Sequence, residues 1–382
     1  MKYVFRGLVK GENSTARRQP AVYTSRVRAR KDKEQSPLNR NEPVSQRMLA
    51  EYLGLSSATI SLVLSGSPVA DSIPQKTKDR VFAAARNFNY RPNFVARSLR
   101  TQRSYMIGVL VPEVSEGYAS AVMGGIEDQL LQEGYFYLVA SHRHMPDLIE
   151  EYPQVLQRRS VEGLIAVDTP WTQQISIPVV SVSGRGKSKG ITQIVLDHDR
   201  AAELALEHLF HLGHRRVAFI KGQSFSSDTE VRWNAIGKAA KRLGLEIRPE
   251  LVVQLEGDSP SPEVGYGVTH KLVANREAFT ALFAFNDISA IGSIRALREN
   301  GYRVPEDVSV VGFDDIQSAA FQNPALTTVR QPLRRMGRLA AETVLSSITA
   351  PTAHKSSRRI MVEPELVVRE STCAASTRKV GR

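Results

Sequence analysis

From Tyr105 onward, the chain alternates short hydrophobic runs with longer amphipathic segments. Met106–Val111, Gly163–Val167 and Val179–Val182 are apolar without alternation, as expected of strands buried on both faces of a sheet. Between the first two, Ala119–Glu133 has the spacing of an amphipathic helix. The pattern predicts parallel strands joined by helices, and it extends too far for one sheet. We therefore expect a two-lobed, doubly wound α/β body.

Seven more segments continue the alternation. Further strands are expected at Phe136–Ala140, Val217–Ile220, Ala281–Phe285 and Val308–Val311, and further helices at Asp199–Leu212, Glu230–Leu243 and Ser289–Asn300. Ligands bind such sheets at the carboxyl ends of the strands. The candidate pocket segments are therefore Pro112–Tyr118, Ser183–Arg185, Asn286-Asp287 and Asp314-Asp315.

A separate stretch, Gln46–Ser65, predicts two short helices around a tight turn. Ser45 and Ser56 are placed to cap the two helices, because a serine hydroxyl accepts a hydrogen bond from an unpaired helix N–H. Gly54 permits the sharp turn between them. A two-helix hairpin in another kind of α-helical domain stays open, but small residues at these spacings within a basic segment favour a helix-turn-helix.

The second of these helices has distinct inner and outer sides. Ile60, Val63 and Leu64 fall at i, i+3 and i+4 and are expected to face inward. The outward positions are Ser57, Ala58, Ser61 and Leu62. A short helix that presents small side chains from a compact support suits the DNA major groove.

A third helix is expected to complete this N-terminal head. It begins near Pro74, carries its apolar side on Val81, Ala84, Ala85 and Phe88, and ends at Tyr90-Arg91-Pro92. The next segment, Asn93–Arg100, is a helical octad too short to be stable alone in water. Leu99 is then either an apolar wedge for the minor groove or a linker residue packed on the body.

The positive charge is concentrated at the N-terminal end. Residues 1–103 hold 20 Lys/Arg and 7 Asp/Glu, whereas the remaining residues hold 31 and 32. This asymmetry predicts a polyanion-binding end joined to a nearly neutral body. Residues 1–43 resemble a disordered basic arm, which either adds attraction to DNA phosphates or is dispensable.

Several classes of protein are disfavoured. No apolar run approaches the ~18 residues of a membrane helix, and MKYVFRGLVKGENS lacks the apolar core of a signal peptide. Cys373 is the only cysteine, so no intrachain disulfide forms, which suits the cytoplasm. Neither Asp314-Asp315 nor Asn286-Asp287 has His or Cys at ligand spacing, and no catalytic triad is recognisable. We expect no metal, no cofactor and no enzymatic activity.

A histidine cluster has two interpretations. His208, His211 and His214 are spaced to permit metal binding. A helix C-terminus that favours positive charge is the preferred explanation, since Arg215 and Arg216 follow directly.

The chain resembles the lactose-repressor/galactose-repressor family of transcriptional regulators from about Val44 to Glu370. The resemblance rests on LAEYLGLSSATIS, NYRPNFVARSL, IGVLVPEVS, LEHLFHLGHRRVAFI, FAFND, VPEDVSVVGFDD and LTTVRQP, in that order. It implies a cytoplasmic, nucleoid-associated bacterial repressor that binds a pseudo-palindromic operator as a homodimer. A small-molecule effector, a sugar or sugar derivative, is expected between the lobes of a body like that of periplasmic sugar-binding proteins.

The resemblance also implies site residues. Operator contacts are expected from the recognition-helix residues Ser56, Ser57, Ala58, Thr59, Ser61 and Leu62 and from the hinge residues Asn93, Ala96, Leu99 and Arg100. Effector contacts are expected from Tyr118, Ser183, Arg232, Asn286, Asp287 and Asp314. In this scheme Arg232 donates a forked pair of hydrogen bonds to ligand oxygens, and Asn286 and Asp314 bind ligand hydroxyls.

Four positions depart from the family pattern. Ala58 and Leu62 replace side chains that read bases by hydrogen bonds, so they offer only apolar contact. Ser183 stands where sugar-responsive members often have Asp, and Ala235 replaces a frequent Gly. The connection before the third helix is about three residues longer than usual.

The implied domains follow the chain. They are an arm (1–43), a helix-turn-helix head (44–91), a hinge helix (92–103), lobe one (104–198 and 333–350), lobe two (199–332 and 351–370) and a tail (371–382). Two other classes remain open: a sugar-binding protein without a DNA role, opposed by the basic head and missing signal peptide, and a doubly wound enzyme, opposed by the absent catalytic constellation.

Overall fold

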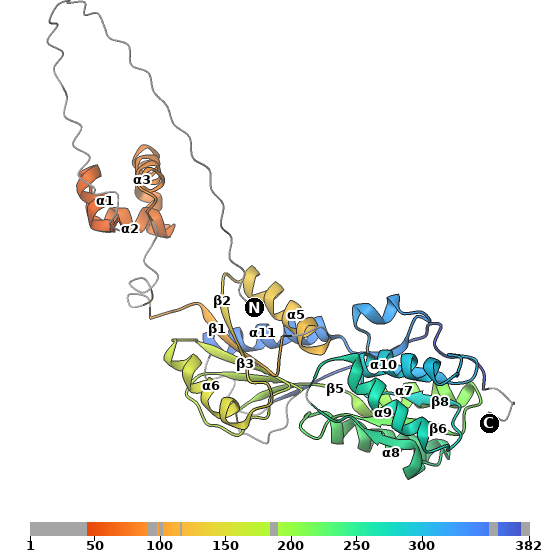
Figure 1. Ribbon diagram of the computed structural model, residues 1–382. Helices are drawn as coiled ribbons and strands as arrows, with labels where there is room; N and C mark the ends of the chain where they lie inside the picture. Colours follow the sequence, from red (N-terminus) through yellow and green to blue (C-terminus); the bar gives the residue numbers. More distant parts are fainter. Residues whose placement is uncertain are drawn as a thin grey trace, which may run out of the picture. The chain divides into compact units, whose positions relative to one another are not determined.

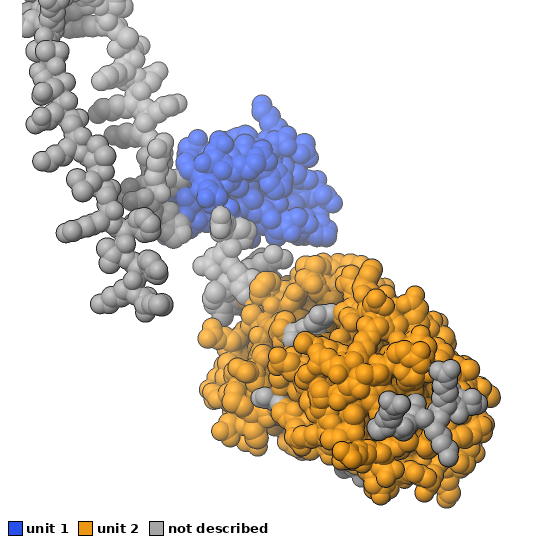
Figure 2. Space-filling view, turned by 45° about the vertical axis from the view of Figure 1, so that its right-hand side comes forward, with its two compact units in different colours: residues 1–93 blue, residues 94–382 orange. Residues whose placement is uncertain are grey.

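The computed structural model describes residues 44–90, 98, 102–114, 117–183, 190–257, 259–350 and 358–375. It divides into two compact units, Met1–Asn93 and Phe94–Arg382 (Figure 2). The expected arm and the hinge residues Asn93, Ala96, Leu99 and Arg100 lie outside the described residues. We call the described part of the first unit the head and the second unit the body.

The head contains the expected helix pair. Helix α1 (Gln46–Leu53) and helix α2 (Ser57–Ser65) turn by 112°, within the range of helix-turn-helix motifs. Ser45 accepts a hydrogen bond from the Met48 amide at 3.2 Å, and Ser56 accepts one from the Thr59 amide at 3.1 Å. Gly54 has φ +62°, a left-handed conformation that costs glycine little. The two caps and the turn predicted from the sequence are confirmed.

Helix α3 (Gln75–Asn87) closes the core of the head. Ile60 and Val63 of α2 pack with Leu49 of α1 and Val81 of α3, all at most 3% exposed. The longer connection between α2 and α3 forms a short 3₁₀-helix, η1 (Pro68–Ser72). Its Ala70 is buried, so the extra residues add to the core of the head.

Two six-stranded sheets form the body (Figure 1). In lobe one the strands are β1 (Met106–Val111), β2 (Phe136–Ser141), β3 (Gly163–Val167), β4 (Val179–Val182), β5 (Thr192–Leu196) and β11 (Arg359–Val362). Their helices are α5 (Tyr118–Gln132), α6 (Pro146–Arg158) and α11 (Leu333–Thr349). The strand order is β2-β1-β3-β4-β5-β11, all parallel.

Lobe two repeats this order. Its strands are β6 (Val217–Lys221), β7 (Val252–Gln254), β8 (Ala281–Phe283), β9 (Ser309–Asp314), β10 (Thr327–Arg330) and β12 (Glu365–Val367). Its helices are α7 (His198–His211), α8 (Thr229–Leu243), α9 (Pro262–Ala274), α10 (Asp287–Glu299) and the short turns η2 (Pro249–Leu251) and η3 (Gln317–Phe321). The order is β7-β6-β8-β9-β10-β12, and only the pairing of β12 with β10 is antiparallel.

The chain crosses between the lobes three times, after β5, after β10 and after β11. The expected assignment of residues 351–370 to lobe two is therefore wrong for β11. Arg359–Val362 pairs with β5 along four residues, and only β12 belongs to lobe two. This pairing is long-range and depends on the preceding helix α11 packing in lobe one, so local sequence did not reveal it.

The expected tail also begins too early at residue 371. Ser371 is fully buried, and its backbone oxygen accepts a hydrogen bond from the Val310 amide at 2.8 Å. His214 contacts the backbone oxygen of Cys373 at 3.0 Å, and His208 contacts the Thr372 hydroxyl at 3.0 Å. Burial lowers the pKa of both histidines. They hold the C-terminal segment on lobe two. His208 lies in the last turn of α7, as expected, and His214 follows the helix, but their lowered pKa values disfavour a positive charge on either ring.

The described residues contain no single membrane-spanning helix and no metal-binding cluster. No single helix there is long and apolar enough to cross a membrane, although the bent pair α1 and α2 would meet that test by length and composition. In the same part of the chain, no group of three or more His, Cys, Asp or Glu side chains is arranged to hold a metal ion.

Candidate effector-binding site and DNA-reading helix

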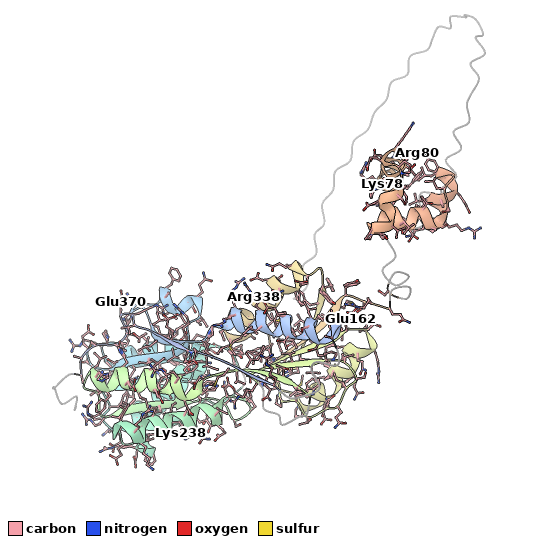
Figure 3. All side chains as sticks on the ribbon, turned by 180° about the vertical axis from the view of Figure 1, so that it is seen from behind. Lys78, Arg80, Glu162, Lys238, Arg338 and Glu370 are labelled. Atoms are coloured by element: carbon pink, nitrogen blue, oxygen red, sulfur yellow. The ribbon has the colours of Figure 1, made fainter. Side chains whose placement is uncertain are left out.

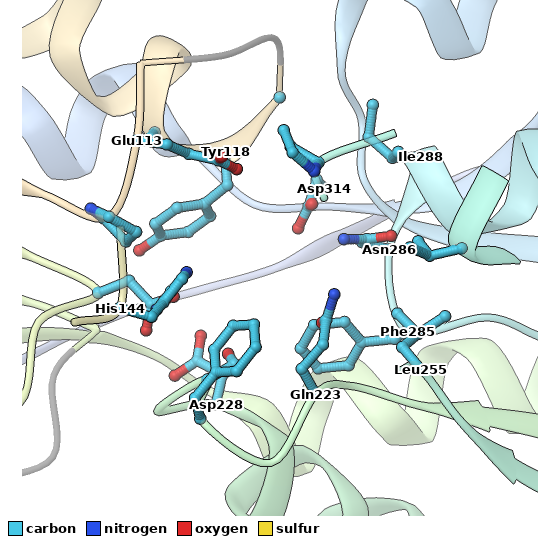
Figure 4. Close-up of a pocket in the computed structure, with 18 of the residues that line it drawn as sticks. Glu113, Tyr118, His144, Gln223, Asp228, Leu255, Phe285, Asn286, Ile288 and Asp314 are labelled. Carbon is cyan, nitrogen blue, oxygen red and sulfur yellow. The ribbon is translucent and has the colours of Figure 1, made fainter. Parts of the chain in front are cut away.

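The order of the strands places a cavity between the lobes. In lobe one β1 lies between β2 and β3, and in lobe two β6 lies between β7 and β8. The strand order therefore reverses at β1 and at β6, and ligands bind at such points of reversal. Pro112 and Asp168 follow β1 and β3, and Gln223 and Asn286 follow β6 and β8. All four line a cavity of about 130 Å³, so both lobes contribute the carboxyl ends of their strands to one site (Figure 4).

Arg232 of α8 supplies the positive charge of the site. It is 4% exposed, and its guanidinium lies 4.4 Å from the ring centre of Phe285 and 3.6 Å from that of Phe313. One terminal nitrogen donates to the Phe285 backbone oxygen, and the other lies 3.7 Å from the Asp228 carboxylate. Because both terminal nitrogens of Arg232 already face protein groups, the side chain has less capacity than expected to donate a forked pair of hydrogen bonds to a ligand.

Three aspartates and Glu113 line the same cavity; Asp314 is buried, and Asp168 and Asp228 are half-buried. Asp314 ends β9 and accepts a hydrogen bond from the Gln331 amide at 2.6 Å. Burial raises its pKa to about 7, against the lowering effect of Arg232. Asp168 accepts hydrogen bonds from the Ser227 amide, at 3.2 Å, and the Ser227 hydroxyl. Burial and the neighbouring Asp228 raise the pKa of Asp168.

Asp228 has a different environment. Burial acts to raise its pKa, but His198 and Arg232 outweigh that effect and hold the pKa below its ordinary value. The His198 ring nitrogen lies 3.5 Å from the carboxylate. Asp228 is therefore the carboxylate best able to stay ionised in the site.

The side-chain amide of Asn286 is oriented by its position at the start of α10. Its oxygen accepts a hydrogen bond from the Ser289 amide at 2.9 Å as the helix cap. The nitrogen consequently faces the cavity, as Figure 4 shows. Tyr118, at the start of α5, also lines the cavity, and its hydroxyl has no hydrogen-bond partner among the described residues. Burial raises the pKa of Tyr118 well above its ordinary value.

Aromatic rings from both lobes meet at the edge of the cavity. His144 of lobe one lies over Phe225 of lobe two, with ring centres 3.9 Å apart. Both residues line the cavity together with Phe285. They give the site apolar surface beside its buried charges, as expected of small-molecule pockets.

Two expected effector residues lie elsewhere. Asp287 points away from the cavity: its carboxylate accepts hydrogen bonds from the Ile316 amide at 2.9 Å and the Thr328 hydroxyl at 2.6 Å. It ties α10 to the segment after β9, so its predicted ligand role is wrong. Ser183 is 3% exposed and does not line the cavity. Its backbone oxygen accepts a hydrogen bond from Ser227 at 2.5 Å, so it supports the wall of the cavity.

Sequence reasoning missed several residues of the site: Asp168, Asp228, His144, Gln223, Phe225 and Phe285. Asp168 directly follows a strand that was predicted correctly, so the rule about carboxyl ends could have identified it. Asp228 precedes Arg232 by four residues, a spacing that places both on one side of a helix. Nothing local in the sequence pairs His144 with Phe225, because they come from different lobes.

In the head, the expected recognition helix presents a small-residue surface. Ser56, Ser57 and Ala58 are exposed, and Thr59, Ser61 and Leu62 are half-buried. Lys78 and Arg80 lie on α3 (Figure 3), and the Lys78 ammonium group lies 3.7 Å from the Asp71 carboxylate. Arg80 donates to the Leu53 backbone oxygen at 3.0 Å, which braces the end of α1 next to the turn.

A helix-turn-helix head joined to a two-lobed body with an interlobe cavity defines a ligand-controlled DNA-binding regulator. Residues 49–93 match the model for bacterial regulatory proteins of the lacI family, and residues 206–372 match a periplasmic binding protein-like domain. The HTH-type transcriptional repressor PurR of Haemophilus influenzae is 32% identical over 337 residues, which cover 85% of this chain and 97% of PurR. The chain belongs to the lacI family.

Solved structures agree with this assignment. A lac repressor dimer bound to operator and the anti-inducer ONPF is 27% identical, with a TM-score of 0.78 over 87% of this chain and all of that one. A complex of the regulator CelR with cellobiose is 25% identical, with a TM-score of 0.63 over 86% of this chain and 99% of that one. These relatives are transcriptional regulators, and the chain is a ligand-controlled, DNA-binding transcriptional regulator of the same family.

Proposed function

We propose that this chain represses transcription by binding a pseudo-palindromic operator as a homodimer, and that a small sugar-like effector in the interlobe cavity controls the operator complex. The observation that carries the effector proposal is the convergence of Arg232, Asn286 and Asp314 on one cavity at the carboxyl ends of both sheets. Donors and acceptors placed together on an apolar wall suit a ligand rich in hydroxyl groups.

For the DNA-reading side, we propose that α2 enters the major groove with Ser57, Ala58 and Leu62 toward the bases. Ala58 and Leu62 have no group that makes paired hydrogen bonds to a base, so they contact thymine methyl groups. The low hydrogen-bonding capacity of this surface leaves more of the specificity to DNA deformability at the centre of the site. Substituting the central base step should therefore cost more affinity than substituting most half-site positions.

Leu99 keeps the role that the family resemblance gives it, as a proposal. A hinge helix that is marginal alone and folds on DNA would insert this leucine into the minor groove. Effector binding would change the angle between the lobes and so the spacing of the two hinge segments in the dimer. The effector can shift this equilibrium only by its differential affinity for the two states.

The direct test is selection of DNA sites from a random pool by the full-length protein, followed by mobility-shift measurements on the selected site. Recovery of a pseudo-palindrome that binds one dimer supports the proposal, and recovery of no preferred sequence contradicts it. Leu99→Ala should weaken binding to the selected site while leaving the thermal stabilisation by ligand unchanged. Val69→Ala, on the exposed surface of η1, is the matched control.

A further inference from the structure

The interlobe cavity carries an excess of negative charge. Four carboxylates line it, those of Glu113, Asp168, Asp228 and Asp314, and among the described residues Arg232 is the one Lys or Arg that does so. One guanidinium balances about one carboxylate, and its nearest carboxylate is Asp228 at 3.7 Å. Burying a charge without a counter-charge is costly. The described part of the lining therefore supplies no second Lys or Arg for the carboxylates that remain.

The excess is greatest at Asp168. The hydrogen-bond donors on its carboxylate are the amide and the hydroxyl of Ser227, which are neutral. Asp314 has Gln331 as its donor, although Arg232 also acts on it electrostatically. Asp228 has both Arg232 and His198 beside it. Arg232 also lowers the pKa of Asp168, but burial and the Asp228 carboxylate raise that pKa more strongly. The strongest charged neighbour of Asp168 is therefore another carboxylate, which makes Asp168 the aspartate with the poorest compensation.

The cavity also has donors that require acceptors on a ligand. The Arg232 Nε atom is buried and has no hydrogen-bond partner among the described residues. The nitrogen of the Asn286 side-chain amide faces the cavity on the side of Asp314 (Figure 4). These donors suit hydroxyl oxygens. The volume of about 130 Å³ is below the roughly 300–1,000 Å³ of pockets for drug-sized ligands, so a single ring fits better than an oligosaccharide.

We infer that the effector is a small polyhydroxylated ring with one protonated amine, an amino sugar of monosaccharide size. Its ammonium group binds at the Asp168 and Asp228 edge, and its hydroxyls bind Asn286, Asp314 and Arg232. The inference rests on the proposed function, since it names the ligand of the same cavity.

Neutral and acidic sugars fit these charges less well. A neutral hydroxyl donates a hydrogen bond to Asp168 but leaves its charge uncompensated, whereas an ammonium group does both. A carboxylate or phosphate on the ligand would add a negative charge to a cavity that is lined by four carboxylates and, among the described residues, by one arginine. The expected order of affinity is therefore amino sugar, then neutral hexose, then hexuronate.

Isothermal titration of the full-length protein tests this order with matched probes. The amines are D-glucosamine, D-galactosamine and D-mannosamine; the controls are the parent hexoses, D-glucuronate and D-galacturonate. At pH 7 at least one amine should bind roughly tenfold or more tightly than its parent hexose, a difference of about 1.4 kcal/mol. Binding should release protons to the buffer, because the ammonium group favours the ionised carboxylates.

Two isosteric variants locate the ammonium group. Asp168→Asn should reduce the ratio between amine and hexose affinity to near one, because it weakens binding of the amine much more than binding of the hexose. Asp314→Asn should weaken both probes alike, because it binds hydroxyls in either case. Tryptophan fluorescence confirms that each variant folds, since Trp171 and Trp233 both lie in the body.

The inference fails if no amine binds, if a hexose or hexuronate binds as tightly as the best amine, or if the preference for the amine survives Asp168→Asn. The operator complex provides a separate readout. If a neutral sugar binds best and alters operator affinity, the ligand class is wrong and the proposed function stands. If an amine binds best but leaves operator affinity unchanged, the ligand class stands and effector control is wrong.

Discussion

Asp314→Asn is expected to stabilise the ligand-free body while impairing its effector site. Asp314 is 5% exposed, and burial raises its pKa from 3.8 to about 7. When folding raises the pKa of a carboxyl, the protonated form favours the folded state. This stabilisation is complete at pH values below the pKa in the unfolded chain, and it is lost as the pH rises through the pKa in the folded chain. Asparagine has nearly the same shape and an oxygen that can still accept from Gln331, but it carries no charge to desolvate.

The magnitude follows from the pKa difference. Each pKa unit corresponds to about 1.4 kcal/mol, and the pKa rises by about 3 units on folding. By this linkage the variant should gain about 2 kcal/mol in free energy of unfolding at pH 5 and about 4 kcal/mol at pH 8.

Urea unfolding of the full-length protein, followed by tryptophan fluorescence, measures this gain. Both tryptophans lie in the body, so the signal reports that unit alone. Asp315→Asn is the matched control, since the neighbouring carboxylate pairs with Arg330 at 2.6 Å and Arg369 at 2.5 Å. It should lose about 1–3 kcal/mol at both pH values. A gain for Asp314→Asn that is equal at pH 5 and pH 8, or a loss at pH 8, refutes the reasoning.

Three further predictions concern packing and assembly. Ser56→Ala removes the cap on the Thr59 amide and should cost about 1 kcal/mol; hydrogen exchange in α2 should accelerate, and unchanged exchange would contradict the cap. Gly337→Ala would place Cβ 2.0 Å from the Val122 backbone oxygen and should cost about 1–3 kcal/mol in urea unfolding, whereas Gly237→Ala in α8, with open space, should be neutral or stabilising. Phe321 is 80% exposed, so Phe321→Lys should raise the dimer dissociation constant measured by sedimentation by roughly tenfold or more. Val69→Lys in the head should leave that constant unchanged, and an equal effect of both variants would refute a dimer contact at Phe321.

The local features of the fold were predictable because their causes are local. Buried strands such as Gly163–Val167 have continuous apolar runs, and the Ser45 and Ser56 caps depend on residues three positions away. Strand β11 was not assigned correctly because its partner β5 lies far along the chain. Helix α6 was not predicted, since Pro153 lies inside it and proline usually marks a helix end.

The site was only partly predictable for a similar reason. Asn286 and Asp287 are adjacent, yet the first faces the cavity and the second anchors the segment after β9. Sequence identifies the helix start but not which of two neighbouring side chains turns inward. The charge excess at Asp168 was also hidden, because it depends on Asp228 from the other lobe. Electrostatic balance in a cavity requires the three-dimensional arrangement.

The central claim is that a ligand in the interlobe cavity controls operator binding. Fluorescence anisotropy of the labelled, selected operator tests it most directly, with saturating amounts of the tightest sugar from the titration series. The operator dissociation constant of the wild type should change by about fivefold or more, and Asn286→Ala, which removes a cavity-facing amide, should abolish that change at the same ligand concentration. An unchanged dissociation constant in the wild type, or an equal change in the variant, would contradict the claim.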